Sequence, residues 1–183
     1  MNMINIIDET TYKLIIKLMS NGMTNFMLFM SHLGSAITLI ILTIAFILLM
    51  KNKTNAKFIA INLILVFVIN RILKFVIARP RPDVLKIVQE SGYSFPSGHS
   101  MVATGFYGFL IYLTYKNIKS KKIKYPLIVL LSILILLIGI SRIYLGAHYA
   151  TDVIGGWIIG FIYLAFFIKY LYKKITKKLK KTF

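Results

Sequence analysis

A histidine and a carboxylate near the end of the chain have the spacing needed for nucleophilic chemistry. His148 and Asp152 are four residues apart, so that on one helix their side chains would lie on the same face and interact. A carboxylate that accepts a hydrogen bond from one imidazole nitrogen fixes the tautomer and leaves the other nitrogen free to attack an electrophile. A second histidine, His99, occurs in another segment and could protonate a leaving oxygen as a general acid.

Three cations complement these groups. The acids around Lys74, Arg81 and Arg142 are too few to neutralise all three. Arginine presents a planar fork of donors matched to phosphate oxygens, and lysine adds a point charge. Ser97 and Gly98 stand just before an apolar run, where the free N–H groups of a helix N-terminus would face an anion. These residues predict a pocket for a dianionic group such as phosphate.

The sequence offers few ligands for a metal ion. The chain has no cysteine and only five acids. Asp83 and Glu90 stand in a predicted loop without paired neighbours, whereas Mg²⁺ is usually bound through carboxylates together with substrate phosphates. We therefore expect no metal, no cofactor and a metal-independent reaction.

The elements that must position these residues are membrane helices. The chain of 183 residues is 58% hydrophobic with a mean hydropathy of +0.77, which is typical of a membrane bundle. Apolar runs that could cross a bilayer, about 20 residues each, occupy residues 27–50, 58–77, 101–115, 125–144 and 153–168. The expected fold is all-α, a single membrane-embedded domain over residues 1–183 with about five to six helices. These include an interfacial amphipathic helix within residues 1–22, and a basic tail over residues 169–183 follows the last run.

The distribution of charge predicts the orientation of the bundle. The net charge is +18, and most of the basic residues follow the first, third and fifth apolar runs, in segments without an acid. The positive-inside rule places these segments in the cytoplasm, where they would contact anionic lipid headgroups. We therefore expect no nucleic acid partner, a multi-pass protein of a bacterial plasma membrane, a cytoplasmic C-terminal tail and an outward-facing site. No obligate protein partner is inferred.

The candidate residues form three motifs in order. "KFVIARPRP" carries Lys74, Arg81 and Pro82; "PSGH" covers residues 96–99; "SRIYLGAHYATD" carries Ser141, Arg142, His148 and Asp152. This order and spacing resembles the three-part signature of the type 2 phosphatidic acid phosphatase superfamily. That superfamily includes bacterial phosphatidylglycerophosphate phosphatases, undecaprenyl pyrophosphate phosphatases, lipid A phosphatases, glucose-6-phosphatase and vanadium haloperoxidases.

The resemblance implies a role for each residue. His148 would attack phosphorus to form a phosphohistidine, Asp152 would orient it, and His99 would protonate the leaving group and then assist water. The phosphoryl oxygens would be held by Lys74, Arg81, Ser97, Gly98 and Arg142, with Pro82, Pro96 and Ser141 in support. The substrate would be a phosphorylated membrane lipid: undecaprenyl pyrophosphate or phosphatidylglycerol phosphate, with phosphatidic acid also open.

Plainer roles exist for each residue taken alone. Lys74 and Arg142 could extend to the membrane interface, and Asp152 could cap a helix. None of these roles requires the others, so the joint pattern favours an enzyme. Arg79 is expected to be an interface or headgroup residue, and His32 a packing residue. The alternative functions are an anion transporter or channel, and a haloperoxidase-like member of the same superfamily; no chain of ionisable groups crosses the lysine-side halves of the runs, as a transporter would need.

Overall fold

The chain folds into a bundle of helices, as predicted. The structure is a computed structural model that describes residues 3–182, and within this range the secondary structure is helical. The elements are α1 (Met3–Lys17), α2 (Asn21–Leu33), α3 (Ala36–Leu49), α4 (Lys53–Ile77), α5 (Gly98–Asn117), α6 (Lys121–Tyr144), α7 (Ala150–Phe166), the π-helical turn η1 (Phe167–Tyr172) and α8 (Lys173–Thr182). Residues 1, 2 and 183, at the outer ends of the two predicted terminal segments, lie outside the described residues.

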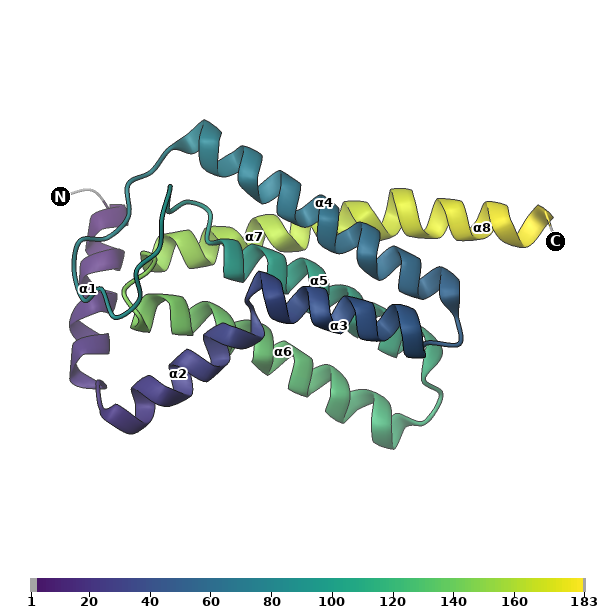
Figure 1. The fold of residues 1–183 in the computed structure, drawn as a ribbon, viewed down its shortest axis with the longest axis horizontal. Helices are drawn as coiled ribbons and strands as arrows, with labels where there is room; N and C mark the ends of the chain where they lie inside the picture. The colour runs from purple at the N-terminus through teal and green to yellow at the C-terminus, as the bar shows by residue number, and fades with distance from the viewer. Residues whose placement is uncertain (1–2, 183) are drawn as a thin grey trace.

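Helix α5 lies at the centre of the bundle and packs against α4, α6 and α7 (Figure 1). Most of its side chains are buried, so it does not need the lipid-facing hydrophobic surface of its neighbours. By length and composition α4, α6 and the continuous helix Ala150–Lys178 can each cross a membrane, and α5 packs against all three. The apolar run expected at residues 101–115 is therefore a central helix that begins at Gly98 with Ser97 as its N-cap.

The first predicted run, residues 27–50, is divided between two helices. Helices α2 and α3 meet at a bend of 50°, and together they have the length and composition of one broken span. The cause is local: Ser35 caps α3, where its Oγ accepts a hydrogen bond from the Thr38 N–H at 3.3 Å. Gly34 completes the break and packs directly against Ile138 of α6.

The predicted basic tail continues the last helix within the described residues. Helix α7 continues through η1 into α8 instead of ending near residue 168. Tyr172 is buried, and its hydroxyl donates to Asn55 Oδ1 of α4 at 2.8 Å and accepts from Lys116 Nζ of α5 at 3.0 Å. These contacts hold the start of the basic segment against the bundle.

Buried polar groups along α4 connect the central helices. Asn62 Nδ2 donates to the Gly105 carbonyl of α5 at 2.8 Å, and the Asn62 carbonyl accepts from the Tyr163 hydroxyl of α7 at 3.0 Å. Nearer the end of α4, Asn70 Nδ2 donates to the Pro96 carbonyl at 3.3 Å. Such bonds fix the register between membrane helices, where apolar contacts alone discriminate poorly.

Small residues allow α5 and α7 to approach closely. A Cβ at Gly156 would lie 2.9 Å from Ser100 Cβ and 3.0 Å from the Ser97 carbonyl oxygen, and one at Gly160 would lie 2.8 Å from Thr104 Cβ. Glycine is therefore required for this helix spacing. The contact at Ser97 places the start of α5 directly against the first turns of α7.

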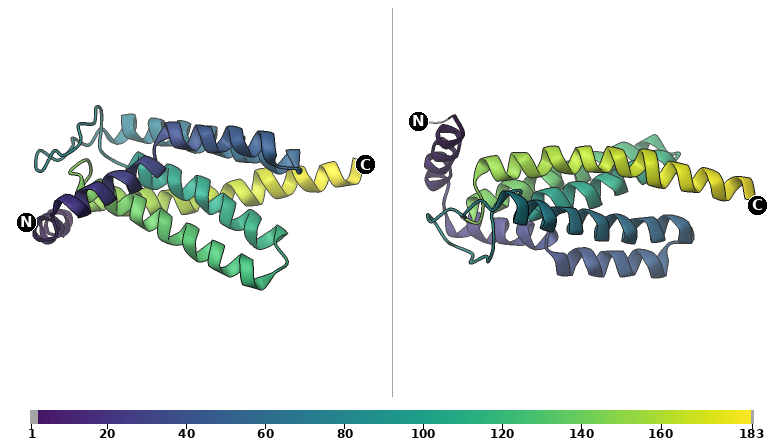
Figure 2. Two further views of the ribbon diagram at one scale, coloured as in Figure 1. Left: turned by 60° about the horizontal axis from the view of Figure 1, so that its bottom comes forward. Right: turned by 90° about the horizontal axis from the view of Figure 1, so that it is seen from above.

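The two ends of the bundle differ. Helix α1 lies across one end, where the long α4–α5 loop and the α6–α7 turn also lie, while the lysine-rich connections gather at the other end (Figures 1 and 2). Helix α1 buries Tyr12 and Ile15 and leaves Leu14 and Ile16 exposed. This arrangement suits a helix that lies along a membrane surface.

We expect the substitution Gly156→Ala to lower both stability and activity. The added methyl group meets the Ser97 backbone, which cannot move without displacing the start of α5. Overpacking of this kind costs about 1–3 kcal/mol, so the melting temperature in detergent should fall. Gly22→Ala is the matched control, because nothing lies within 4 Å of a Cβ there. Equal melting temperatures for the two variants would contradict this account.

Candidate active site

One cavity of about 500 Å³ brings the three motifs together. Lys74 at the end of α4, Arg81 in the following loop, Gly98 and His99 at the start of α5, and His148 before α7 all line it. These residues are separated by up to 74 positions in the sequence and come from four segments. The cavity thus combines cations, a helix N-terminus and two imidazoles.

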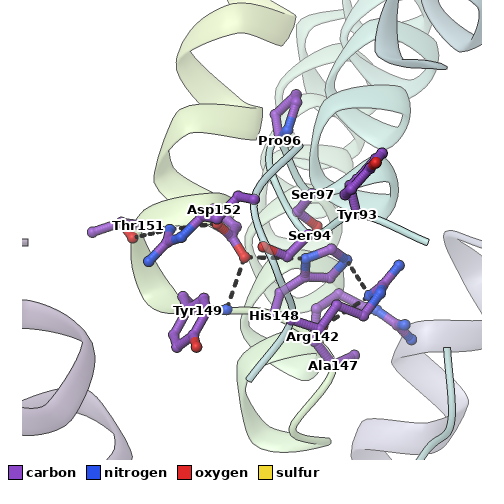
Figure 3. A network of polar contacts seen from close by, with 12 residues as sticks. Tyr93, Ser94, Pro96, Ser97, Arg142, Ala147, His148, Tyr149, Thr151 and Asp152 are labelled. Carbon is purple, nitrogen blue, oxygen red and sulfur yellow. Dashed lines mark hydrogen bonds and ion pairs between the residues drawn. The ribbon is translucent and has the colours of Figure 1, made fainter. Parts of the chain in front are cut away.

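His148 and Asp152 interact, although His148 is not on the helix. It precedes Tyr149, the N-cap of α7, and its Nδ1 lies 3.4 Å from Asp152 Oδ2. The same carboxylate oxygen accepts the Tyr149 N–H at 3.0 Å, so Asp152 both caps α7 and faces the imidazole. His148 and Asp152, four residues apart, therefore meet across the N-cap turn of α7 and do not share one face of a helix. Figure 3 shows Asp152 between Thr151 and the His148 ring.

His148 is 2% exposed, and its Nε2 is the nitrogen turned away from Asp152. Arg81 Nη1 lies 3.4 Å from this Nε2. Burial lowers the pKa of His148 to about 4; the hydrogen bond with Asp152 opposes this shift, and Lys74 and Arg81 add to it. The imidazole is therefore neutral near pH 7, the state in which Nε2 has a free lone pair.

Lys74 and Arg81 are held by main-chain carbonyl groups of the α4–α5 loop and, for Arg81, also of the α6–α7 turn. Lys74 Nζ donates to the carbonyl oxygens of Tyr93 at 2.7 Å and Ser94 at 3.1 Å. Arg81 donates to the carbonyls of Ser91, Gly92 and Ala147. These acceptors are neutral, so both cations keep their positive charge for a ligand in the cavity.

Arg142 pairs with an acid, whereas Lys74 and Arg81 have no acid partner among the described residues. It is 2% exposed, and its two terminal nitrogens contact Ser31 Oγ of α2 and Glu90 Oε1 of the α4–α5 loop. Glu90 lines the cavity and is thus not an isolated loop residue. Asp83 is paired as well, with Lys86, but on the surface. A phosphate that contacts Arg142 would share it with Glu90.

The start of α5 has the predicted form. Ser97 is fully buried; its Oγ accepts from the N–H and the hydroxyl of Ser100, and its own N–H donates to the Asp152 carbonyl at 3.0 Å. Gly98 lines the cavity, and a Cβ there would lie 3.2 Å from Asn70 Oδ1. Ser97 thus caps the start of α5, and Gly98 leaves the backbone there open to the cavity.

The three supporting residues lie around this site and are buried. The Pro96 carbonyl accepts a hydrogen bond from the side-chain amide of Asn70. Pro82 follows Arg81 in the loop, and the Ser141 hydroxyl donates to the Ile138 carbonyl at 2.7 Å. They shape the backbone and do not line the 500 Å³ cavity.

Arg79, predicted to be an interface or headgroup residue, is partly exposed and is not among the residues that line the cavity. Its Nη1 donates to Asp152 Oδ1 at 2.6 Å and its Nη2 donates to Asp8 Oδ2 of α1 at 2.8 Å. Its guanidinium carbon lies 4.2 Å from the centroid of the Tyr149 ring. Two carboxylates brought close by the tertiary fold attract this arginine inward.

Several residues of the site were not assigned from the sequence. Asn70, Glu90 and Ser31 each contact a predicted site residue or line the cavity, and Asp8 contacts Arg79, which in turn binds Asp152. Asn70 could have been identified from the sequence, since it is a polar residue within an apolar run and lies one turn before Lys74. Nothing in the local sequence marks the other three. His32, predicted to pack, is exposed.

Among residues 3–182, no three histidines, cysteines or acids are grouped as a metal site would require. The donor set around the cavity is mainly cationic and imidazole. It suits an anion.

Comparison with known proteins matches this architecture. The model of the PAP2 superfamily matches residues 55–176. Phosphatidylglycerophosphatase B of Bacillus subtilis is 42% identical over 113 residues, which cover 60% of this chain and 54% of that protein. An undecaprenyl-diphosphatase of the same organism is 34% identical over 125 residues, which cover 63% of this chain and 60% of the relative. The match spans less than two thirds of the length of either relative.

Two solved structures share the fold. A transmembrane PAP2-type phosphatidylglycerolphosphate phosphatase from Bacillus subtilis superposes with a TM-score of 0.85 at 30% identity, covering 96% of this chain and 89% of that one. LpxE of Aquifex aeolicus gives a TM-score of 0.71 at 26% identity, covering 89% and 95%. The chain is a multi-pass membrane protein of this kind.

The pKa of His148 predicts the acidic limb of the pH profile. If His148 attacks as a neutral imidazole, kcat/KM should stay high as the pH falls through 6.5 and decline only near pH 4. Asp152→Asn should move this limb to still lower pH, because the carboxylate raises the pKa of His148. The measurement is kcat/KM against pH for both proteins; a wild-type limb between pH 6 and 7 would contradict the prediction.

Proposed function

The chain belongs to the PAP2 superfamily, and from that premise we propose that it is a membrane lipid phosphatase that acts through a phosphohistidine. The cavity supports this function most directly. Lys74, Arg81, His99 and His148 lie on its polar side, whereas side chains of α3 and α4 form an apolar wall. A lipid with a phosphorylated headgroup matches both parts.

The apolar wall reaches the outside of the bundle. Ile40 of α3 and Ile64, Phe67 and Phe75 of α4 line the cavity and are between 41% and 73% exposed. In a membrane this surface is covered by acyl chains. A lipid could therefore place its phosphate in the cavity while its tail stays between α3 and α4 in the bilayer.

The proposed reaction uses each histidine in turn. Nε2 of His148 attacks phosphorus, and the bond between phosphorus and the leaving oxygen breaks as His99 gives that oxygen a proton. Asp152 holds Nδ1 and stabilises the charge that develops on the ring. Water then attacks the phosphohistidine and gives its proton to His99, which releases inorganic phosphate and restores His148.

The phosphoryl oxygens would be held by protein groups alone. Lys74, Arg81 and Arg142 supply positive charge, and Ser97 and Gly98 supply donors at the N-terminus of α5. These groups take the place that Mg²⁺ holds in many phosphoryl transfer enzymes. We therefore propose that the reaction is metal-independent.

Arg71 favours a substrate with a second anionic group. It lines the cavity one turn before Lys74, and its guanidinium carbon lies 5.3 Å from the centroid of the Phe67 ring, on the apolar side. Among the described residues it pairs with no acid. The leaving group of undecaprenyl pyrophosphate or phosphatidylglycerol phosphate retains a charged phosphate, whereas that of phosphatidic acid is uncharged. We propose one of the first two lipids as the preferred substrate.

The charge pattern supports an outward-facing site. The lysine-rich connections lie at the end of the bundle opposite the α4–α5 loop and the α6–α7 turn (Figure 1), and residues of that loop and turn line the cavity. Lysine-rich segments remain in the cytoplasm. In a bacterial plasma membrane the active site would then act on lipids of the outer leaflet.

The direct test is phosphate release by the purified protein in EDTA. Undecaprenyl pyrophosphate, phosphatidylglycerol phosphate and phosphatidic acid are assayed in parallel in mixed micelles, with His148→Ala beside the wild type. We expect release by the wild type, loss of about 10³-fold or more in the variant, and an acid-labile phosphoprotein after rapid quenching.

The lipid ranking identifies the substrate. No release from any of the three lipids by well-folded protein would reject the proposed function. Release that requires added Mg²⁺ would reject metal independence alone.

Arg71→Met tests the preference for a second anion. Loss of one charge-assisted hydrogen bond is worth about 1.5–3 kcal/mol, so kcat/KM for the two lipids with a second phosphate should fall about 10- to 100-fold. Phosphatidic acid hydrolysis should change much less. Lys13→Met on the exposed face of α1 is the control for removing a cation. An equal decrease for all three lipids would contradict a role in specificity.

A further inference from the structure

The N-terminus of α7 holds two carboxylates that share one arginine. Asp152 Oδ1 and Asp8 Oδ2 accept from the two terminal nitrogens of Arg79, at 2.6 and 2.8 Å. Asp8 is 4% exposed and Asp152 is fully buried. Carboxylates this deeply buried require compensation, and a planar guanidinium can serve one with each arm.

The hydrogen bond from Arg79 gives the two oxygens of the Asp152 carboxylate different partners. Oδ1 is taken by Arg79, which leaves Oδ2 for the Tyr149 N–H and for His148 Nδ1. The carboxylate therefore cannot turn without breaking a 2.6 Å charged contact. Its plane, and with it the orientation of His148, depends on where Arg79 lies.

Asp8 fixes the position of Arg79 from a different helix. Its Oδ1 accepts the Thr151 N–H of α7 at 2.9 Å, and the Thr151 hydroxyl contacts both of its oxygens at 2.9 and 3.0 Å. Arg79 Nη1 also donates to this hydroxyl at 2.8 Å. The face of Tyr149 covers the guanidinium at 4.2 Å. Arg79 is thus enclosed by contacts from α1 and α7.

We propose that Arg79 is a positioning residue for His148, acting through Asp152, and that Asp8 makes the docking of α1 part of this arrangement. This inference rests on the proposed phosphatase reaction. In that reaction positive charge develops on His148 as phosphorus is attacked, and a carboxylate held in place stabilises it better than one that must reorient. Helix α1 then influences the rate without touching the substrate.

The experiment uses the full chain in detergent, with the lipid that the wild type hydrolyses fastest. The variants are Arg79→Met, Arg79→Lys, Asp8→Asn and the double variant Arg79→Met with Asp8→Asn. The control is Lys86→Met, which removes a cation of the same loop that pairs with exposed Asp83. For each protein we measure kcat, KM, inhibition by inorganic phosphate and the melting temperature.

We expect Arg79→Met to lower kcat about 10- to 100-fold, the usual effect of removing a partner of a reacting group. KM and the inhibition constant for phosphate should stay close to the wild-type values, because Lys74, Arg81 and Arg142 are untouched. Arg79→Lys should recover part of kcat. Asp8→Asn should lower kcat less, and it should have no further effect once Arg79 is methionine.

Other outcomes overturn the inference. An Arg79→Met protein with wild-type kcat shows that the orientation of Asp152 does not depend on Arg79. A parallel loss of kcat, phosphate binding and melting temperature in both Arg79 variants shows a merely structural role. If Arg79→Met does not fold, Arg79→Lys and Asp8→Asn decide: lower kcat at unchanged phosphate inhibition supports the proposal, and unchanged kcat in both rejects it. If the wild type and the Lys86→Met control are both inactive, the proposed function itself is rejected.

Discussion

The burial of positive charge at one end of a membrane bundle is the constraint on which the site depends. Lys74 and Arg142 are 8% and 2% exposed, and a buried cation without partners would be very costly. The partners come from the α4–α5 loop: the carbonyls of Tyr93 and Ser94 bind Lys74, and Glu90 binds Arg142. The loop therefore folds over the cations and forms part of the cavity wall. Because most of these acceptors are neutral, the site stays positive enough to attract a phosphate.

Close packing of the central helices places the rest of the chemistry. Gly156 and Gly160 let α7 approach α5 so closely that the Ser97 N–H reaches the Asp152 carbonyl at 3.0 Å. The helix that presents Gly98 and the helix that carries Asp152 are then connected at their first turns. Larger residues at these two glycines would separate the N-terminus of α5 from Asp152 and the proposed nucleophile. The spacing between reacting groups is thus set by helix contacts that never meet the substrate.

The sequence alone determined the helices and the end of the bundle at which the site forms. Apolar runs must match the fixed thickness of a bilayer, so the ends of successive runs alternate between its two sides. Lys74, Ser97, Arg142 and His148 stand at run ends that fall on the same side, which is why their convergence could be predicted. The types and spacing of these residues indicated the chemistry that the site could perform. This information is local, and it needs no knowledge of which helices touch.

Tertiary structure decided how the charges are paired. Arg79 was expected to be an interface or headgroup residue, and the sequence did not indicate that it bridges Asp152 and Asp8, the latter 71 residues away in the chain. Glu90, a loop residue with no second carboxylate beside it in the sequence, meets Arg142 across 52 residues. Such partners depend on how helices and loops pack, because a hydrogen bond has a range of about 3 Å and sequence separation does not indicate which groups come that close.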